Sequence, residues 1–162
     1  MKFKHILNES VKPKTLQELS SIINQTIKEQ GNNCDLNFID VSNMTDLSYL
    51  FGDSKFNGDI SKWDVSKVEI MEGMFYNSDF NGDISKWNVS NVKNMTYMFE
   101  KSKFNKDISK WDVSSVEFMT GMFAKSRFNK NISKWRVSNV LYMSGMFNNC
   151  PLVFDPPKWY KD

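Results

Sequence analysis

Histidine, the side chain best suited to acid–base and metal chemistry near neutral pH, occurs once in this chain, as His5 near the amino terminus. With no second histidine, the sequence offers no ordinary Ser-His-Asp, Cys-His or histidine-metal site. The recurring pair Ser61-Lys62 could supply a nucleophile and a base, but adjacent residues of a strand point to opposite faces. We therefore predict that the chain is not an enzyme and has no catalytic residues.

Side-chain oxygens recur at a fixed spacing and raise the question of calcium. The repeated carboxylates are Asp59, Asp83 and Asp107, and the repeated amides are Asn57, Asn81 and Asn105. Stacked oxygens of this kind are calcium ligands in other proteins. In turns, however, Asp and Asn normally accept hydrogen bonds from nearby backbone. Because the carboxylate column changes to Asn131 and no glycine-rich calcium repeat is present, we predict no metal site and no cofactor.

Lysine forms a third periodic column, which we call the lysine ladder: Lys62, Lys86, Lys110, Lys134 and Lys158. A row of cations could bind a polyanion or nucleic acid. The alternative is a solvated face on which lysine discourages edge pairing. The net charge of the chain is only +2, so no overall field favours nucleic acid or a membrane surface as the partner.

These columns belong to a repeat of 24 residues. Trp recurs as Trp63, Trp87, Trp111, Trp135 and Trp159. Met and Phe keep the same spacing as Met71, Met95, Met119 and Met143, and as Phe75, Phe99, Phe123 and Phe147. Repetition at a fixed period of this length is typical of stacked repeat architectures, in which one unit cannot bury its own apolar face. We expect the Trp, Met and Phe columns to form the core.

One unit can be divided by its periodicities. The segment 59–65 is rich in residues that favour strands, and we predict a short strand there. Apolar residues then follow at Val68, Met71, Met74 and Phe75, a three-to-four-residue spacing that predicts a short helix. Ser66 with Glu69 matches a helix capping box. The fold prediction is therefore a solenoid of about five 24-residue coils, each made of strand, short helix and turn.

The ends of such a stack need caps. Residues 1–34 are predicted to form an amino-terminal tail and a capping helix, which begins at the capping box of Thr15 and Glu18 and ends at Gly31. Residues 35–162 are predicted to form the repeat array and a carboxy-terminal cap, where Pro151, Pro156 and Pro157 cannot continue a ladder well.

The unit W-D-V-S-x-V-x-x-M-x-x-M-F-x-x-S-x-F-N-x-D-I-S-K resembles the BspA-like leucine-rich-repeat surface-protein family, also described as a mycoplasma lipoprotein-associated repeat, over residues of about 35–159. The resemblance implies a right-handed leucine-rich-repeat-like solenoid. It also implies adhesion or protein binding, because the family is typical of bacterial surface proteins.

In repeat proteins, specificity resides in positions that vary while the frame stays constant. The variable positions that we select as partner-binding candidates are Phe118, Tyr142, Arg136, Tyr97 and Asp112. Tyr and Arg are common anchors of protein interfaces. We therefore predict a non-catalytic protein-binding module. The alternatives are a structural subunit that self-associates through its ends or its lysine ladder, and, less favoured, a polyanion or nucleic-acid binder.

Location remains open from the sequence. The first ten residues, MKFKHILNES, contain no apolar stretch of the ~7–15 residues found in a signal peptide, which favours the cytoplasm. Proteins of the family that the repeat resembles are often exposed at the surface, which favours the opposite location. No apolar run reaches the ~18–20 residues of a membrane span. The sequence names no partner and no oligomeric state.

Overall fold

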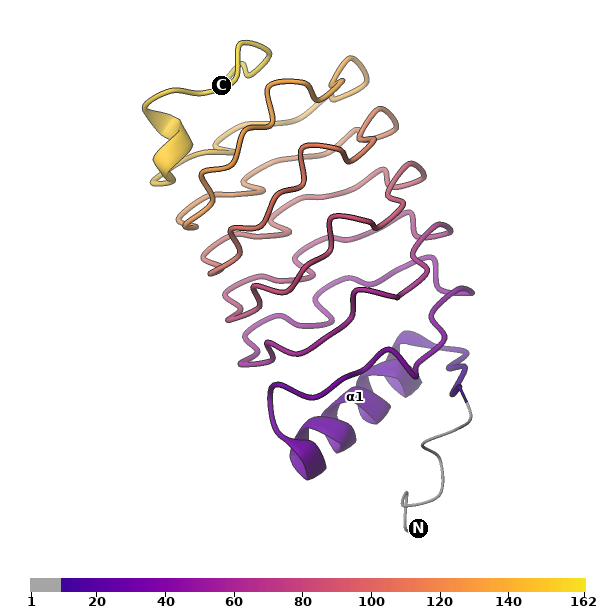
Figure 1. Cartoon of the computed structure of the whole chain (residues 1–162). Coiled ribbons are helices and arrows are strands. Elements are labelled where there is room, and N and C mark those ends of the chain that lie inside the picture. Colours follow the sequence, from indigo (N-terminus) through magenta and orange to yellow (C-terminus); the bar gives the residue numbers. More distant parts are fainter. Residues whose placement is uncertain (1–9) are drawn as a thin grey trace.

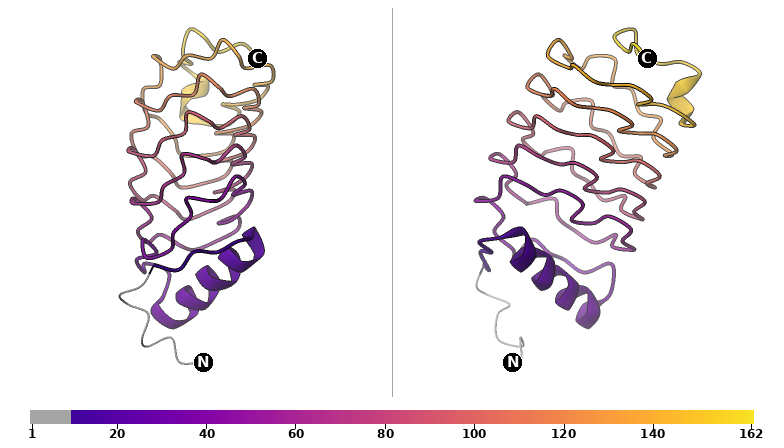
Figure 2. Two further views of the ribbon diagram at one scale, coloured as in Figure 1. Left: turned by 90° about the vertical axis from the view of Figure 1, so that its right-hand side faces the viewer. Right: turned by 180° about the vertical axis from the view of Figure 1, so that it is seen from behind.

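The computed structural model describes residues 10–162, so His5 lies outside the described residues. The described chain contains one α-helix, α1 (Leu16–Gln30), and one 3₁₀ helix, η2 (Pro151–Val153). Between them the chain runs in successive loops that lie one above another, which we call the coil stack (Figure 1). Side and rear views show the same layered arrangement, with α1 at one end and the carboxy-terminal segment at the other (Figure 2).

Helix α1 begins and ends where the sequence predicts. The hydroxyl of Thr15 accepts a hydrogen bond from the amide of Glu18 at 3.1 Å, which satisfies one unpaired donor of the first turn. Gly31 ends the helix with a φ of 86°, and its amide bonds to the carbonyl of Ile27. Leu19 and Ile23 are buried in the core, so α1 covers the apolar end of the first coil (Figure 1).

The segment predicted as a strand, 59–65, forms turns instead. The amide of Trp63 bonds back to the carbonyl of Ile60 at 3.2 Å, and the amide of Ser61 bonds to Asp59 Oδ1 at 2.9 Å. Both bonds close the chain on itself within three residues, so its backbone groups are not free for a continuous ladder. In the described part of the chain, the β-bridges between coils are isolated and parallel and do not extend into strands.

The segment predicted as a short helix also consists of turns. Gly73 and Asn77 have φ values of 55° and 48°, and the amide of Met74 bonds to the carbonyl of Met71. A residue in the left-handed region at the third position of each four-residue turn is typical of type II turns and interrupts a right-handed helix. The Ser66–Glu69 pair consequently caps no helix: the amide of Ser66 bonds to Asp64 and that of Glu69 to Thr45 of the previous coil.

The predicted coil of strand, short helix and turn is therefore wrong, and with it the leucine-rich-repeat-like solenoid. Consecutive four-residue turns bring residues three or four apart to the same side, as a helix does, so the spacing of Val68, Met71, Met74 and Phe75 fits both structures. The inward positions were predicted well despite the wrong elements: all four of these side chains are fully buried.

The coils are joined by backbone hydrogen bonds that repeat at each junction. Alternate amides of one coil donate to alternate carbonyls of the next at 2.8–2.9 Å, in the pairs Met71–Asn94, Gly73–Thr96, Phe75–Met98 and Asn77–Glu100. The same set of hydrogen bonds recurs at the other junctions, within residues 47–76, 95–124 and 119–148. Because the bonds pass between coils, a single coil cannot satisfy its own backbone, and neighbouring coils stabilise each other.

The core consists of stacked columns of identical side chains. Phe75 and Phe99 stack with ring centroids 5.5 Å apart, and Trp63 and Trp87 with centroids 6.5 Å apart. Each Trp indole N–H also donates to the carbonyl of an apolar residue 27 positions earlier, as Trp87 does to Ile60 at 3.2 Å. The Trp, Phe and inner Met columns are thus structural, as their periodicity predicts.

Candidate functional site

The outward positions of each coil follow from the tandem turns. In each coil, the residue just before the consecutive turns forms a parallel bridge with its counterpart in the next coil. These bridged residues make up one column: Asp46, Ile70, Asn94, Phe118 and Tyr142. This column lies on the surface, because the next residue of each coil, such as Met95 or Met119, points into the core. Its side chains vary from coil to coil, whereas the Met column beside it is constant in the inner coils.

The structure brings two of the predicted binding residues together on this column. The rings of Phe118 and Tyr142 stack face to face, with centroids 5.4 Å apart and an interplanar angle of 6°. Tyr142 is 57% exposed, and Leu141 beside it is 68% exposed. We call these three side chains the aromatic patch. The two rings do not pack between helices, because the described coils contain no helix at these positions.

Tyr97 lies on the same side of the coil, three residues after the bridge position Asn94. It is 37% exposed, and its ring covers Gly121 of the next coil: a Cβ atom at Gly121 would lie 2.7 Å from the ring. Tyr97 has a φ of 55°, the left-handed value that Gly121 also adopts. The ring thus lies against the neighbouring coil, and Tyr97 remains partly exposed.

Asp112 and Arg136 form a separate group. They occupy one column on consecutive coils, six residues before the aromatic column, and the turn closed by the Val116 amide and the Val113 carbonyl lies between. Hydrogen bonds from Ser114 lower the pKa of Asp112, and the charge of Arg136 lowers it further. Both residues are exposed. The predicted site therefore divides into an aromatic part and a charged part.

Three exposed apolar residues of this side were not selected from the sequence: Leu141, Tyr49 and Ile70. Leu141 stands at a repeat position that the earlier coils fill with polar residues: Thr45, Glu69, Lys93 and Glu117. This change from polar to apolar was the signal in the sequence that could have identified Leu141. Tyr49 is 47% exposed, and its ring covers Gly73 as Tyr97 covers Gly121. Its hydroxyl donates to Glu72 at 3.1 Å. Tyr49 occupies the same repeat position as Tyr97, two coils earlier, and this correspondence could have identified Tyr49 from the sequence.

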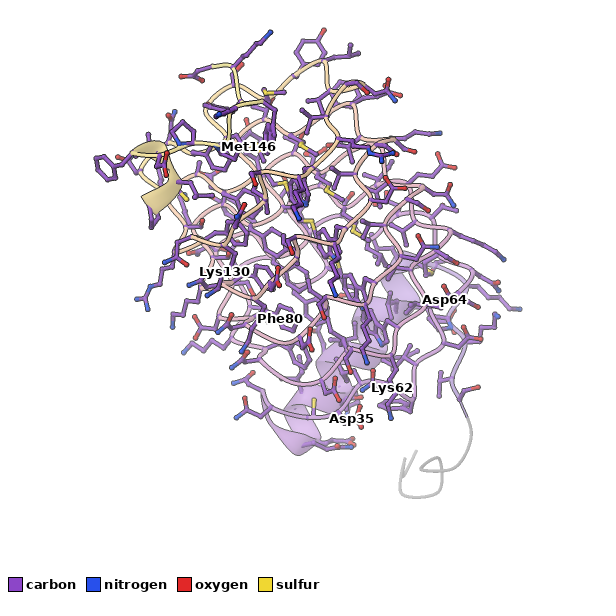
Figure 3. The ribbon with its side chains drawn as sticks, turned by 45° about the horizontal axis from the view of Figure 1, so that its top comes forward. Asp35, Lys62, Asp64, Phe80, Lys130 and Met146 are labelled. Carbon is purple, nitrogen blue, oxygen red and sulfur yellow. The ribbon has the colours of Figure 1, made fainter. Side chains whose placement is uncertain are left out.

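The lysine ladder is exposed along its whole length, and its members lie near the carboxylates of the turns. Lys62 contributes to lowering the pKa of Asp59, although the hydrogen bonds from Ser61 contribute more. A surface hollow near the carboxy-terminal end contains Lys130 and Lys134 but also Asp107. Figure 3 places Lys130 and Asp64 toward opposite margins of the molecule. The ladder is therefore a face of mixed charge.

The oxygens considered for calcium are occupied by backbone donors. Asp83 and Asp107 each accept the amide of the serine two residues later at 2.9 Å. Asn57 and Asn81 each accept the amide of the next coil's asparagine, at 2.8 and 2.9 Å. Within residues 10–162 no group of three His, Cys, Asp or Glu side chains could hold a metal ion. These side chains thus support the turns and the junctions between coils.

A stack of 24-residue, turn-rich coils with variable outer columns places the chain in the class of repeat proteins. The chain belongs to the family described as "Mycoplasma protein of unknown function, DUF285", which matches residues 17–126 and 100–159. This match is to a Mycoplasma-associated family and does not specify the narrower BspA-like leucine-rich-repeat group. Searches of curated proteins and of solved structures found no match. In the part of the chain that the structure describes, no helix has the length and apolar character needed to cross a membrane.

Proposed function

We propose that this chain is a non-catalytic protein-binding module and that its partner contacts the aromatic patch. The observation that carries the proposal is the stack of the half-buried Phe118 ring on the exposed Tyr142 ring, with the exposed Leu141 next to Tyr142 in the chain. The Phe rings at 51, 75, 99, 123 and 147 are buried in a column, so a Phe ring at the surface departs from the pattern of the core. Apolar surface of this kind, rich in aromatic residues, is typical of protein-binding sites.

The rigidity of the frame supports the same proposal. Phe118 stands on backbone that is bridged to the coils on both sides, at Asn94 and at Tyr142. A partner would therefore lose little affinity to ordering this ring. The repeat unit resembles that of BspA-like surface proteins in sequence, although its coils are not the predicted strand, helix and turn. This resemblance also favours protein binding and adhesion.

A structural subunit that self-associates through its ends is the second candidate, and hydrogen-bond geometry argues against the arrangement in which two carboxy-terminal ends meet. One end is covered by α1 (Figure 2). The other end presents a row of backbone amides, and two such rows facing each other would oppose donor to donor. Association through the lysine ladder would bring the lysines of two copies together, although the carboxylates beside them reduce the repulsion. Polyanion binding remains the third candidate.

The experiment is a quantitative affinity capture from source lysate with four versions of the chain. Wild type is compared with Phe118→Ala/Tyr142→Ala, with Lys110→Glu/Lys134→Glu, and with Phe154→Ala as the matched control. Phe154 is 92% exposed and lies outside the aromatic patch, so its loss removes an exposed ring elsewhere. All versions must first melt like wild type.

A protein that is captured by wild type and by Phe154→Ala, and lost with Phe118→Ala/Tyr142→Ala, supports the proposal. The expected loss is at least tenfold in affinity, since truncating an interface anchor typically costs ~2 kcal/mol or more. If all four versions capture the same proteins, the aromatic patch is not the binding face. If only the lysine variant loses its partner, the polyanion candidate replaces it. Arg136→Glu and Asp112→Lys, measured separately, show whether the charged group takes part.

A further inference from the structure

The exposed large apolar side chains of the described residues gather at a few repeat positions of the coil stack. Five of the seven occupy only three such positions: Tyr49, Ile70, Tyr97, Leu141 and Tyr142. The other two, Val153 and Phe154, belong to the carboxy-terminal segment. Exposed apolar surface that is concentrated in this way is typical of an interaction face.

Hydrogen bonds between coils join these positions into one surface. The carboxylate of Glu72 accepts from the hydroxyl of Tyr49 at 3.1 Å and from Asn94 Nδ2 at 3.2 Å. Three consecutive coils therefore meet at Glu72. The parallel bridges keep successive coils in register, so each repeat position forms a column across the surface. We call the surface formed by the columns of Tyr97, Tyr142 and Leu141 the outer face.

One column of the outer face carries alternating charge. It runs Thr45, Glu69, Lys93, Glu117 and Leu141. Lys93 Nζ lies 2.8 Å from Glu69 Oε2, and this hydrogen bond raises the pKa of Lys93. The charge of Glu117, one coil further on, raises the same pKa further. The three charged side chains thus lie along one line in the order negative, positive, negative. We call this line the charged column.

A second copy of the outer face, turned end for end, carries the complementary charges. If a two-fold axis lies in the plane of contact and crosses the stack, each column meets itself with the order of the coils reversed. The charged column then pairs unlike charges only when the axis passes between Glu69 and Lys93 or between Lys93 and Glu117. An axis through Lys93 or through Glu117 would oppose that residue to its own copy.

The apolar residues distinguish the two remaining axes. With the axis between Lys93 and Glu117, Ile70 of one copy meets Tyr142 of the other. With the axis between Glu69 and Lys93, Phe118 would meet the carboxylate of Asp46, and Tyr142 would have no counterpart in the column. Burial of apolar surface therefore favours the first axis.

We propose that the partner of the aromatic patch is a second copy of this chain, bound antiparallel through the outer face with Lys93 of each copy opposite Glu117 of the other. The inference rests on the proposed function, because it names the partner of the same patch. By symmetry the charge pair forms twice near the axis, and the contact of Tyr142 with Ile70 forms twice farther from it. Neither the ends of the stack nor the lysine ladder takes part.

The test measures dimerisation of the full chain by sedimentation equilibrium. Two charge-reversal variants, Lys93→Glu and Glu117→Lys, are studied alone and mixed in equal amounts. Lys86→Glu is the matched control for Lys93→Glu, because Lys86 is an exposed lysine of the lysine ladder and its reversal changes the net charge equally. Phe118→Ala/Tyr142→Ala tests the apolar part of the contact.

Each charge-reversal variant alone is expected to dimerise at least about tenfold more weakly than wild type, because like charges then face each other twice across the contact. In the mixture, the new glutamate of one variant faces the new lysine of the other, and the unchanged Lys93 and Glu117 face each other. A heterodimer of nearly wild-type affinity should therefore form, which also shows that both variants are folded. Lys86→Glu should dimerise as wild type does. Phe118→Ala/Tyr142→Ala should dimerise at least about tenfold more weakly.

Three results would overturn the antiparallel dimer. The first is a wild-type chain that stays monomeric at concentrations up to ~1 mM. The second is a mixture of the two charge-reversal variants that dimerises no better than either variant alone. The third is equal weakening by Lys86→Glu, which would indicate a general charge effect.

Failure of the dimer and failure of the proposed function give different results. If wild type is monomeric and Phe118→Ala/Tyr142→Ala still loses a protein captured from lysate, the aromatic patch binds another partner and only the dimer is wrong. If Phe118→Ala/Tyr142→Ala changes neither dimerisation nor capture, the patch is not a binding face and both proposals are wrong.

Discussion

Single residues in this molecule are constrained by the coil next to them. The ring of Tyr49 covers Gly73 so closely that a Cβ atom at Gly73 would lie 2.2 Å from Tyr49 Cε1. Gly145 has a similar left-handed φ, but a Cβ atom there would meet only the flexible side chain of Asn148, at 2.8 Å. A glycine is thus required at position 73 by both the left-handed backbone and the adjacent ring, and at position 145 mainly by the left-handed backbone.

Gly73→Ala is expected to lower the free energy of unfolding by ~2–4 kcal/mol, since ~1 kcal/mol or more comes from the left-handed backbone and ~1–3 from overpacking against Tyr49. Gly145→Ala should lower it by only ~1 kcal/mol. Chemical denaturation measures both. Adding Tyr49→Ala to Gly73→Ala should recover the overpacking part. Equal losses at the two glycines would show that the ring does not matter.

The buried indole bonds provide a second prediction at the residue scale. Trp111 is 4% exposed, and its N–H donates to the carbonyl of Ile84 at 3.1 Å. Trp111→Phe keeps much of the apolar contact but leaves that carbonyl unpaired, so a loss of ~2–4 kcal/mol in unfolding free energy is expected. Trp159→Phe, at a half-buried ring with the same bond to Ile132, should lose less in the same denaturation experiment. A larger loss at Trp159 would contradict this order.

At the scale of elements, the segment before α1 is tied to the first coil. Val11 bridges to Ile39, and the amide of Asp40 donates to the Val11 carbonyl at 2.8 Å. The carboxylate of Asp40 accepts from Ser42 and from Lys12 Nζ, both at 2.9 Å. Hydrogen bonds from Ser42 and then Lys12 lower the pKa of Asp40 to about 2. These contacts fasten the segment that leads into the capping helix.

A lowered carboxyl pKa means that the charged form stabilises the fold. The contribution of Asp40 should be complete above the unfolded pKa of ~4 and should be lost as the pH falls through about 2. Because Lys12 and Asp40 are partly exposed, the effect should be modest and reduced by salt. Urea denaturation between these pH values should show a steeper loss for wild type than for Asp40→Asn. Parallel curves would contradict the assignment.

At the scale of the whole molecule, the two ends of the coil stack are unequal. Helix α1 buries the first coil, whereas Val137, Val140 and Met143 of the last coil are only half-buried. Their counterparts one coil earlier are almost completely buried. A coil with a neighbour on one side has fewer contacts to lose, so local opening should begin at the carboxy-terminal end.

Native-state hydrogen exchange tests this asymmetry. The junction amides of Met119 and Lys125 should exchange faster than those of Met71 and Asn77, because they open with the last coil. Leu19→Ala, which leaves a cavity under α1, should raise the exchange at the first junction and so reduce the difference between the ends. Uniform protection along the stack in wild type would mean that the coils open together.

The sequence alone determined the repeat, the inward columns and the capping helix. Identical side chains every 24 residues can be buried only if the units stack, so the Trp, Phe and inner Met columns were assigned to the core correctly. Helix α1 was predictable because its signals are local: a capping threonine, an apolar face and a terminal glycine.

The path of the chain within a coil was decided only by the tertiary structure. Over eight residues a helix and two tandem turns give the same apolar spacing, and the left-handed conformations fall on Tyr97, Asn77 and Lys101 as well as on glycines. What selects the turns is the next coil, because its carbonyls accept the amides that a helix would use internally. The same stacking pairs Phe118 with Tyr142 and leaves Arg136 and Asp112 apart from them, since side chains 24 residues distant become neighbours only when the coils are in register.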